Sequence, residues 1–279
     1  MAKENPLASN LTLEQQKNLF GNAYLNMLWH CPTDQRFPYW VHLPDCYYDE
    51  KDPHYKLLVI IHGTGCAVED YVRHAKELAD RDHVAVLAPL FPGGLIQRDD
   101  FNSYKLLSCD GVRYDQILLD MIDDMAKRYP GVETDKFFLF GHSGGGQFVN
   151  RFLFAHPEKL RACAIGAPGR PTFLNPDEDY FWGTRDFKNY FGHDVDLAAV
   201  QKVPVLVIVG ENDTKFIGDS PYGDNRVARM KSLQKNLQDH GVHTELTILP
   251  GFAHEGGEKE RASSGCNCRR QLATDSRHP

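Results

Sequence analysis

The 279-residue sequence lacks the features of several protein classes. It has no apolar run near the roughly 18 residues of a membrane span, and its N-terminal residues lack the apolar core of a secretory signal. Its net charge is −7, and no basic block occurs before the last twenty residues, which argues against nucleic acid or an anionic membrane as the main partner. The seven cysteines are odd in number and irregularly spaced, so they do not indicate a disulfide framework. We therefore expect a reduced, cytoplasmic, globular protein.

Signatures of bound cofactors are also lacking. Cys266 and Cys268 stand without the further ligands that a zinc site needs. Gly144, Gly145 and Gly146 follow an apolar run, but they do not extend into the G-x-G-x-x-G fingerprint of dinucleotide-binding proteins, and no phosphate-binding loop occurs. We expect neither a metal nor a cofactor.

Short apolar runs alternate with amphipathic segments along most of the chain. Strands are predicted at 36–45, 56–63, 83–89, 136–141, 161–169, 203–210 and 243–251. Helices are predicted at 69–81, 112–129, 145–156 and 223–240. This alternation is typical of an α/β protein whose mostly parallel sheet carries helices on both faces.

The chain is predicted to have one main domain, residues 36–256. Residues 1–35 form an N-terminal helical extension, with an amphipathic helix expected over 11–28. Residues 170–200 interrupt the alternation with seven aromatic side chains and are interpreted as a short lid insertion. Residues 257–279 are polar, with almost no apolar side chains, and are predicted to be disordered.

The first candidate catalytic motif lies where a predicted strand turns into a helix. Residues 141–145 read G-H-S-G-G and fit the pattern G-x-S-x-G, which presents Ser143 as a nucleophile on a sharp turn. The backbone N–H of Gly144 would open the helix and stabilise a developing oxyanion. The alternative is a small-residue turn without a catalytic role.

Two further candidates follow later strands. Asp213 comes after the run 203–210, with Glu211 as the alternative acid, and His254 lies in a loop after the last predicted strand. In open parallel sheets, ligands bind beyond the carboxyl ends of the strands, so these side chains should meet Ser143 there. Serine, acid and histidine in this order predict a catalytic triad, although each residue alone would be an ordinary loop residue.

The second oxyanion donor is expected in the glycine-containing turn after the strand at 56–63. Thr64 N–H is the first choice and Gly65 N–H the alternative. His62 is expected to support this loop through hydrogen bonds. Cys66 lies nearby, but no sharp turn presents it as a nucleophile.

Together these motifs resemble the α/β-hydrolase superfamily over roughly residues 36–256. The segments IIHGTG, GHSGG, GEND and GFAH are similar to those of small esterases of the polyhydroxyalkanoate-depolymerase-like, feruloyl-esterase-like and dienelactone-hydrolase-like branches. The resemblance implies a serine hydrolase that cleaves a carboxylic ester or a lactone through an acyl-enzyme. Such domains usually end in a helix after the histidine loop, but the sequence after His254 has no apolar face for one.

The predicted substrate is a hydrophobic or aromatic small molecule that contacts Phe181 and Trp182 in the lid. The alternative is that the lid rings only pack on the body of the domain. The loop after Pro89 is expected to form another wall of the pocket. Two other functions remain open, an acyltransferase that uses the same triad and a non-catalytic ligand-binding protein.

Overall fold

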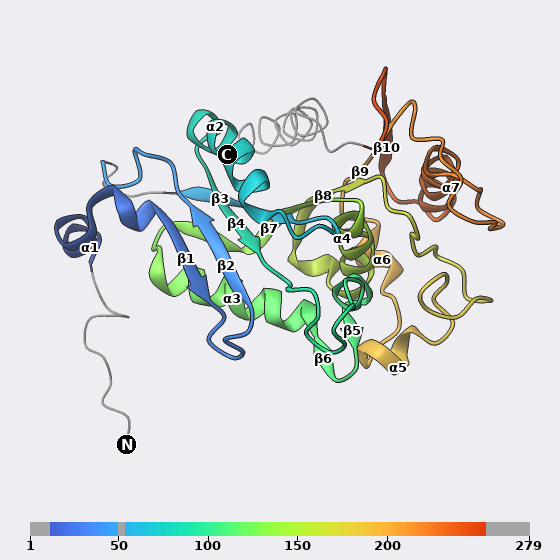
Figure 1. Ribbon diagram of the computed structural model, residues 1–279, viewed down its shortest axis with the longest axis horizontal. Coiled ribbons are helices and arrows are strands. Elements are labelled where there is room, and N and C mark those ends of the chain that lie inside the picture. Colours follow the sequence, from blue (N-terminus) through green and yellow to red (C-terminus); the bar gives the residue numbers. More distant parts are fainter. Residues whose placement is uncertain (1–11, 50–53, 255–279) are drawn as a thin grey trace.

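The computed structural model of the protein describes residues 12–49 and 54–254, and its centre is an eight-stranded sheet (Figure 1). The strand order is β1-β2-β4-β3-β7-β8-β9-β10. The strands are β1 (Asn26–His30), β2 (Pro38–His42), β3 (Tyr55–Ile61), β4 (Val84–Pro89), β7 (Val132–His142), β8 (Leu160–Gly166), β9 (Val205–Gly210) and β10 (Thr244–Leu249). Strands β1 and β2 run antiparallel to their neighbours, whereas every pair from β4 to β10 is parallel. The predicted mostly parallel sheet is confirmed.

The two faces of the sheet pack against different helices. Helix α2 (Val68–Asp82) covers one face, where it contacts a cluster that includes Leu58 and Phe138. Three helices share the larger cluster on the opposite face: α3 (Tyr114–Arg128), α4 (Gly144–Ala155) and α7 (Arg226–Asp239). Successive side chains of a strand point to opposite faces of the sheet, and helices cover both faces. Apolar residues are therefore needed at successive positions, which explains the apolar runs of the sequence.

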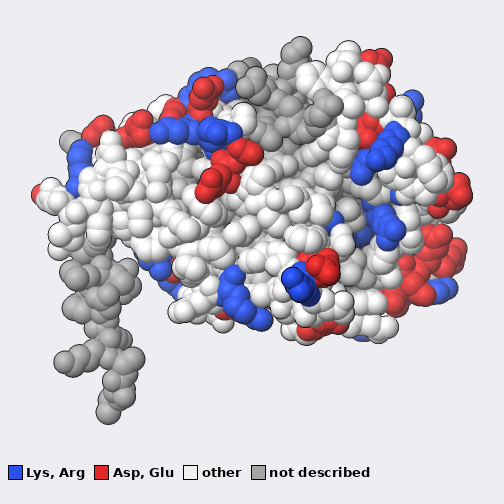
Figure 2. Space-filling view, in the orientation of Figure 1, with Lys and Arg blue, Asp and Glu red and all other residues white. Residues whose placement is uncertain are grey.

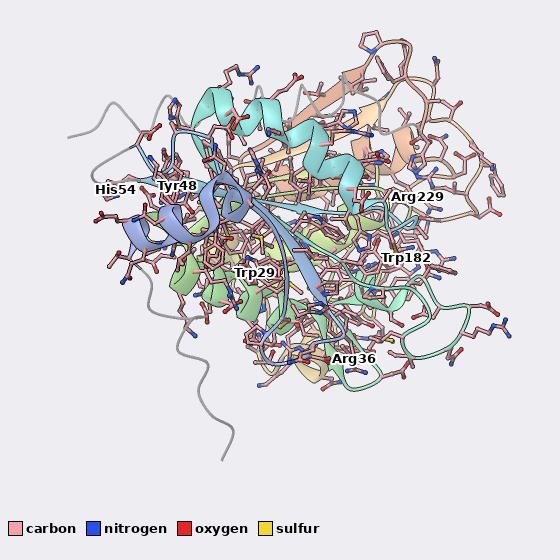
Figure 3. The ribbon with its side chains drawn as sticks, turned by 60° about the vertical axis from the view of Figure 1, so that its left-hand side comes forward. Trp29, Arg36, Tyr48, His54, Trp182 and Arg229 are labelled. Carbon is pink, nitrogen blue, oxygen red and sulfur yellow. The ribbon has the colours of Figure 1, made fainter. Side chains whose placement is uncertain are left out.

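The N-terminal segment differs from its prediction. Helix α1 (Leu13–Phe20) ends where Gly21 adopts a φ of 54°, and residues 21–25 form a 3-10 turn. The following residues form β1, which pairs with β2, so the helix predicted over 11–28 is wrong beyond Phe20. Alternating half-buried and exposed side chains in β1 are typical of an edge strand. Figure 3 labels Trp29 of this strand. The Arg128 guanidinium carbon lies over the Trp29 ring, 3.9 Å from the ring centre.

The segment between β8 and β9 contains two short helices, α5 (Phe187–Phe191) and α6 (Leu197–Val200). Four of its seven aromatic side chains are buried in the large cluster: Phe173, Tyr180, Phe187 and Phe191. Most of these rings therefore pack on the body of the domain, which agrees with the alternative interpretation of this segment as a packing element. The predicted tail at 257–279 lies outside the described residues.

A buried ionic network joins α3 to the end of α4. Asp115 has no solvent exposure, and its Oδ2 lies 2.6 Å from Arg113 Nη2 and 2.8 Å from His156 Nε2. Although burial raises the pKa of Asp115, its hydrogen bonds with Arg113 and His156 lower it to about 2.

The surface seen in Figure 2 carries charges of both signs, interspersed with large uncharged areas. No helix in the described part of the chain combines the length and apolar content needed to span a bilayer. The five cysteines of this part form no disulfide bond: Cys31, Cys46, Cys66, Cys109 and Cys163.

Candidate active site

Ser143 occupies a strained turn between β7 and α4. Its φ and ψ are 57° and −111°, a conformation that residues with a side chain rarely adopt. Its backbone N–H donates to the Gly166 carbonyl at 2.8 Å, which ties the turn to β8. Such strain costs roughly 1–3 kcal/mol and persists where the surrounding structure enforces it. The turn places Ser143 at the carboxyl edge of the sheet.

The glycines around Ser143 allow strand and helix to approach closely. A Cβ on Gly141 would lie 2.5 Å from the Gly145 carbonyl oxygen, and one on Gly145 would lie within 3 Å of the Ile61 carbonyl oxygen. Gly146 has the same role against β8, because its Cβ would collide with the Gly166 carbonyl oxygen. The position of Gly146 in the GGG run therefore has a steric reason that the sequence alone did not provide.

The structure brings Ser143, Asp213 and His254 together. His254 lies in the loop after β10, and its Nε2 is 2.9 Å from Ser143 Oγ. Its Nδ1 is 2.6 Å from Asp213 Oδ2, at the end of β9. A carboxylate can only accept, so Nδ1 carries the proton and Nε2 is left to accept the serine proton.

Asp213 is almost completely buried, with 1% of its surface exposed. Burial raises the pKa of its carboxyl group, but the hydrogen bond from His254 and the nearby charge of Arg226 outweigh burial, and the net pKa lies below its usual range. Arg226 Nη1 lies 3.3 Å from the second carboxylate oxygen, Oδ1. The Asp213 carboxyl group is therefore held ionised, and its two oxygens accept hydrogen bonds from His254 and from Arg226.

Glu211, the alternative acid, has a different position. Its Oε2 accepts a hydrogen bond from the Gly251 N–H at 3.0 Å, within the loop that leads to His254. A Cβ on Gly210 would collide with the Phe252 carbonyl, so this glycine lets the loop pass close to the end of β9. Glu211 and Gly210 thus support the histidine loop, and Asp213 makes the contact with the ring.

The predicted oxyanion donors lie next to each other. Gly144 is the first residue of α4, so its N–H has no partner within the helix. The Thr64 nitrogen lies 3.1 Å from the place where a Cβ on Gly144 would stand. Thr64 N–H donates to no acceptor among the described residues. The arrangement leaves two N–H groups beside Ser143.

Buried side chains support the Thr64 loop. His62 Nε2 accepts from the Phe91 N–H at 3.0 Å, so its proton is on Nδ1, which donates to the Gly63 carbonyl at 2.7 Å. Burial lowers the pKa of His62 to about 4, and the ring stays neutral. Cys66 is a poor nucleophile here because burial raises the pKa of its thiol.

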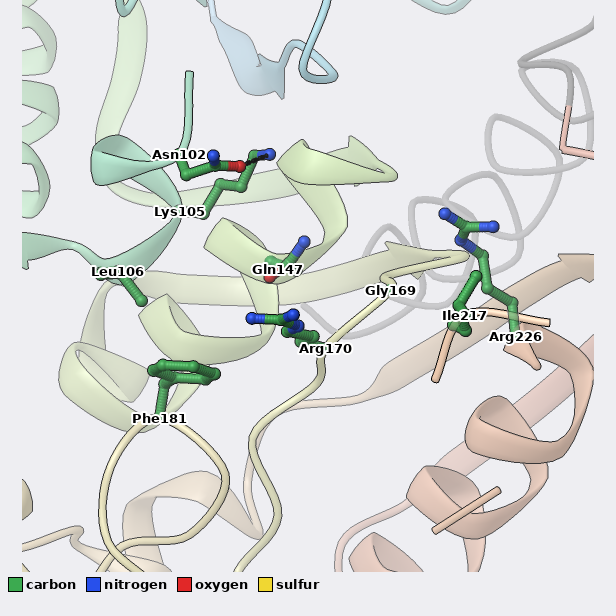
Figure 4. A pocket seen from close by; sticks show the side chains of 9 residues that line it. All are labelled: Asn102, Lys105, Leu106, Gln147, Gly169, Arg170, Phe181, Ile217 and Arg226. Atoms are coloured by element: carbon green, nitrogen blue, oxygen red, sulfur yellow. Dashed lines mark hydrogen bonds between the residues drawn. The ribbon is translucent and has the colours of Figure 1, made fainter. Parts of the chain in front are cut away.

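A pocket with a volume of about 420 Å³ lies close to these residues, because Arg226, which lines it, contacts Asp213, and Lys105, which also lines it, lies next to Gly144. Its lining residues are Asn102, Lys105, Leu106, Gln147, Gly169, Arg170, Phe181, Ile217 and Arg226 (Figure 4). The loop after Pro89 supplies one wall, as predicted. Phe181 lines the pocket, whereas Trp182 does not; it lies beside Arg229, 5.2 Å from the guanidinium (Figure 3).

The sequence did not identify two charged residues of this site. Arg226 opens α7, and its contact with Asp213 depends on how that helix packs against the end of β9. Lys105 lies in a short 3-10 turn, Ser103–Leu106, next to Tyr104, whose hydroxyl donates to the His62 carbonyl at 3.1 Å. Neither residue stands at a motif position, so no pattern in the sequence points to it.

Comparison with known proteins assigns the chain to a family. Residues 44–272 match the dienelactone hydrolase family, which is most of the chain. The chain belongs to this family. The predicted resemblance to the α/β-hydrolase superfamily is thereby confirmed, and membership supports a hydrolase activity on esters.

Solved structures share the fold at low sequence identity. LpqC, a poly(3-hydroxybutyrate) depolymerase from Bordetella parapertussis, is 19% identical with a TM-score of 0.71 over 97% of both chains. Poly(aspartic acid) hydrolase-1 from Sphingomonas sp. KT-1 is 19% identical with a TM-score of 0.68, over 88% of this chain and 96% of its own. An S-formylglutathione hydrolase from Agrobacterium tumefaciens is 14% identical with a TM-score of 0.59, over 95% and 96%. No curated protein sequence matches the chain.

Proposed function

We propose that this protein is a serine hydrolase that cleaves a carboxylic ester or a lactone through an acyl-enzyme. One observation carries the proposal, the continuous hydrogen-bonded path from Ser143 Oγ through His254 to Asp213. The path starts on a strained turn beside two N–H groups and next to a pocket. A turn without a catalytic role would not need this arrangement.

The first half of the reaction forms the acyl-enzyme. Ser143 Oγ attacks the ester carbonyl carbon while His254 Nε2 takes the serine proton. Asp213 holds the ring in the required tautomer and stabilises the imidazolium that forms. The N–H groups of Gly144 and Thr64 donate to the tetrahedral oxyanion, each contributing about 3–4 kcal/mol in comparable sites. His254 then gives its proton to the leaving alkoxide.

The second half regenerates the enzyme. Water gives a proton to His254 Nε2 and attacks the acyl carbon, the Ser143 ester bond breaks, and the proton returns to Oγ. For a lactone, the leaving alcohol remains attached to the acyl group, so the product is a hydroxy acid. Phe181 supplies an apolar wall for the hydrocarbon part of the substrate. Trp182 is not proposed as a substrate contact.

A panel of acyl esters and lactones of graded size tests the proposal. Wild type should hydrolyse members of the panel, and Ser143→Ala should lower kcat by about 10⁶-fold, as expected when a triad nucleophile is removed. Ser232→Ala is a matched control, because Ser232 lies in α7, is not among the residues that line the pocket and should be dispensable. Hydrolysis by Ser143→Ala at the wild-type rate would reject the proposed nucleophile.

A further inference from the structure

Helix α4 contains a completely buried cation, Arg151. Every acceptor that the described residues offer to its guanidinium is an uncharged oxygen. Burial lowers the pKa of Arg151 to about 10, so the group is still protonated at neutral pH and keeps all its N–H donors. Burying a guanidinium without a carboxylate is costly, and well-packed apolar side chains often serve stability as well or better. The contacts of Arg151 indicate what the cation provides instead.

The guanidinium joins three parts of the chain. Its Nη1 donates to the Lys105 carbonyl at 2.5 Å, and its Nη2 donates to the Arg170 carbonyl at 2.8 Å. Its Nε donates to the Thr172 hydroxyl at 3.0 Å, and this hydroxyl in turn donates to the Phe181 carbonyl. The planar fork of a guanidinium holds several acceptors in fixed directions, unlike the compact ammonium group of a lysine.

The parts that Arg151 joins form walls of the pocket. Lys105, Arg170 and Phe181 all line the pocket, the first from a 3-10 turn and the other two from the segment between β8 and β9 (Figure 4). Gln147, one helical turn before Arg151 on α4, lines it as well. Because the first three residues lie outside long helices and strands, their positions depend on contacts such as those of the guanidinium.

Arg151 contacts the pocket walls without contacting the reacting atoms. Its guanidinium carbon lies 5.4 Å from the centre of the Phe181 ring. Ser143 directly precedes α4, and Arg151 is eight residues further along the chain, which corresponds to about 12 Å along a helix axis. None of its hydrogen bonds with described residues involves a member of the triad. A change at this position should therefore alter how a substrate fits and leave the hydrogen bonds of the triad intact.

We propose that Arg151 is a positioning residue that fixes the walls of the substrate pocket and thereby determines which esters the enzyme accepts. It does so through its two carbonyl acceptors and through the Thr172 hydroxyl. A pocket held in one shape orients the substrates that match it and binds poorly those that do not. This inference rests on the proposed ester hydrolysis at Ser143 and adds the residue that sets its substrate selectivity.

Two series of esters of graded length test the inference. The first consists of 4-nitrophenyl esters from acetate to hexanoate and varies the acyl side. The second consists of alkyl acetates from methyl to hexyl and varies the alcohol side. Wild-type kcat and KM are measured for each ester, and calorimetry with Ser143→Ala measures binding without turnover. Selectivity is the ratio between the best and the worst ester of a series, in kcat/KM or in binding constant.

We expect wild type to show a selectivity of about tenfold or more in at least one series, since a single ill-fitting methylene group can change kcat/KM by this much. Arg151→Met should lower the selectivity about fivefold or more, mainly through KM, and should change kcat for the shortest ester less than about threefold. Arg151→Lys should lower it as well, because lysine keeps the charge and loses the fork. Thr172→Val, which removes one acceptor and the bond to the Phe181 carbonyl, should cause a smaller loss and decides the question if neither Arg151 variant folds.

Asp115→Asn is the matched control for a purely structural effect. Asp115 is also a buried charged residue, but its network lies at the other end of α4, and neither Asp115 nor its partners Arg113 and His156 line the pocket. The substitution should lower stability and leave the selectivity within about twofold of wild type.

Three results would overturn the inference: a wild type that accepts all members of both series equally, a selectivity that survives in the folded variants, or an equal loss for every ester. The two proposals fail separately. If the selectivity appears only in binding to Ser143→Ala, disappears when Arg151→Met is added and is accompanied by no wild-type hydrolysis, the serine hydrolase is rejected and the positioning role stands. If Ser143 hydrolyses esters with a selectivity that does not depend on Arg151, the positioning role is rejected.

Discussion

Replacing Asp213 by asparagine tests how the histidine is oriented. Asp213 accepts from His254 Nδ1 with Oδ2 and lies 3.3 Å from Arg226 Nη1 with Oδ1. An asparagine has one oxygen and one NH₂ group. Arg226 can only donate, so the amide oxygen is expected to turn toward it and the NH₂ group toward His254. The ring must then accept at Nδ1 and carry its proton on Nε2, facing Ser143.

This tautomer cannot take the serine proton, and the charge that stabilises the imidazolium is also lost. We expect Asp213→Asn to lower kcat by about 10⁴-fold, or roughly 5.5 kcal/mol in activation free energy, as in other triads that lose this carboxylate. The assay is kcat for a 4-nitrophenyl ester at saturation, with circular dichroism to show that the fold is retained.

Glu211→Gln is the matched control. Its side chain touches the Gly251 N–H rather than His254, so the substitution should reduce kcat less than about tenfold. If Asp213→Asn retains activity within tenfold of wild type, the reasoning is refuted. A large loss in Glu211→Gln with an active Asp213→Asn would make Glu211 the partner of the histidine.

Three further predictions concern stability and the thiol. Gly145→Ala should lower the free energy of unfolding by about 1–3 kcal/mol, because its Cβ collides with the β3 backbone, although alanine otherwise favours helices; an unchanged urea midpoint would contradict this. Cys66→Ala should retain esterase activity, because partial burial raises the pKa of the thiol and keeps it protonated; loss of turnover in a folded variant would count against it. The pKa of Asp115 is about 2 when folded and 3.8 in the reference state, so its ionic network stabilises the protein above pH 4 and ceases to do so as the pH falls through 2. The stability difference between wild type and Asp115→Asn should therefore shrink by about 2 kcal/mol over that range in urea titrations, and a difference that grows toward low pH would refute the sign.

Much of the sheet could be predicted because buried parallel strands leave a strong local signal. The central strands carry apolar runs, and Thr64, Ser143, Asp213 and His254 each follow the end of a strand. The N-terminal strand could not be recognised in this way. Only one face of the edge strand β1 is half-buried, so its apolar pattern is weak. The helix before it, Leu13–Phe20, has the helical pattern that was extended over the strand, and it ends at Gly21, where φ is positive.

The candidate site was predicted in part for a similar reason. Ser143, Asp213 and His254 come from three segments far apart in the sequence, and the parallel sheet brings their strand ends to one edge. Lys105 and Arg226 could not be predicted as site residues, because their positions depend on how a 3-10 turn and a helix pack, which no short motif encodes. Of the two lid aromatics that the sequence predicted as substrate contacts, only one lines the pocket. Phe181 lines it, but much of the remaining lining is polar or cationic.

Covalent labelling of Ser143 tests the central claim most directly. A fluorophosphonate reacts with a serine only when a base activates its hydroxyl and an oxyanion site accepts the phosphoryl oxygen. Intact mass spectrometry of wild type should show one adduct per chain, and peptide mapping should place it on Ser143. Ser143→Ala should remain unlabelled, and His254→Ala should react far more slowly. An unlabelled wild-type protein, or an adduct on another residue, would contradict the account.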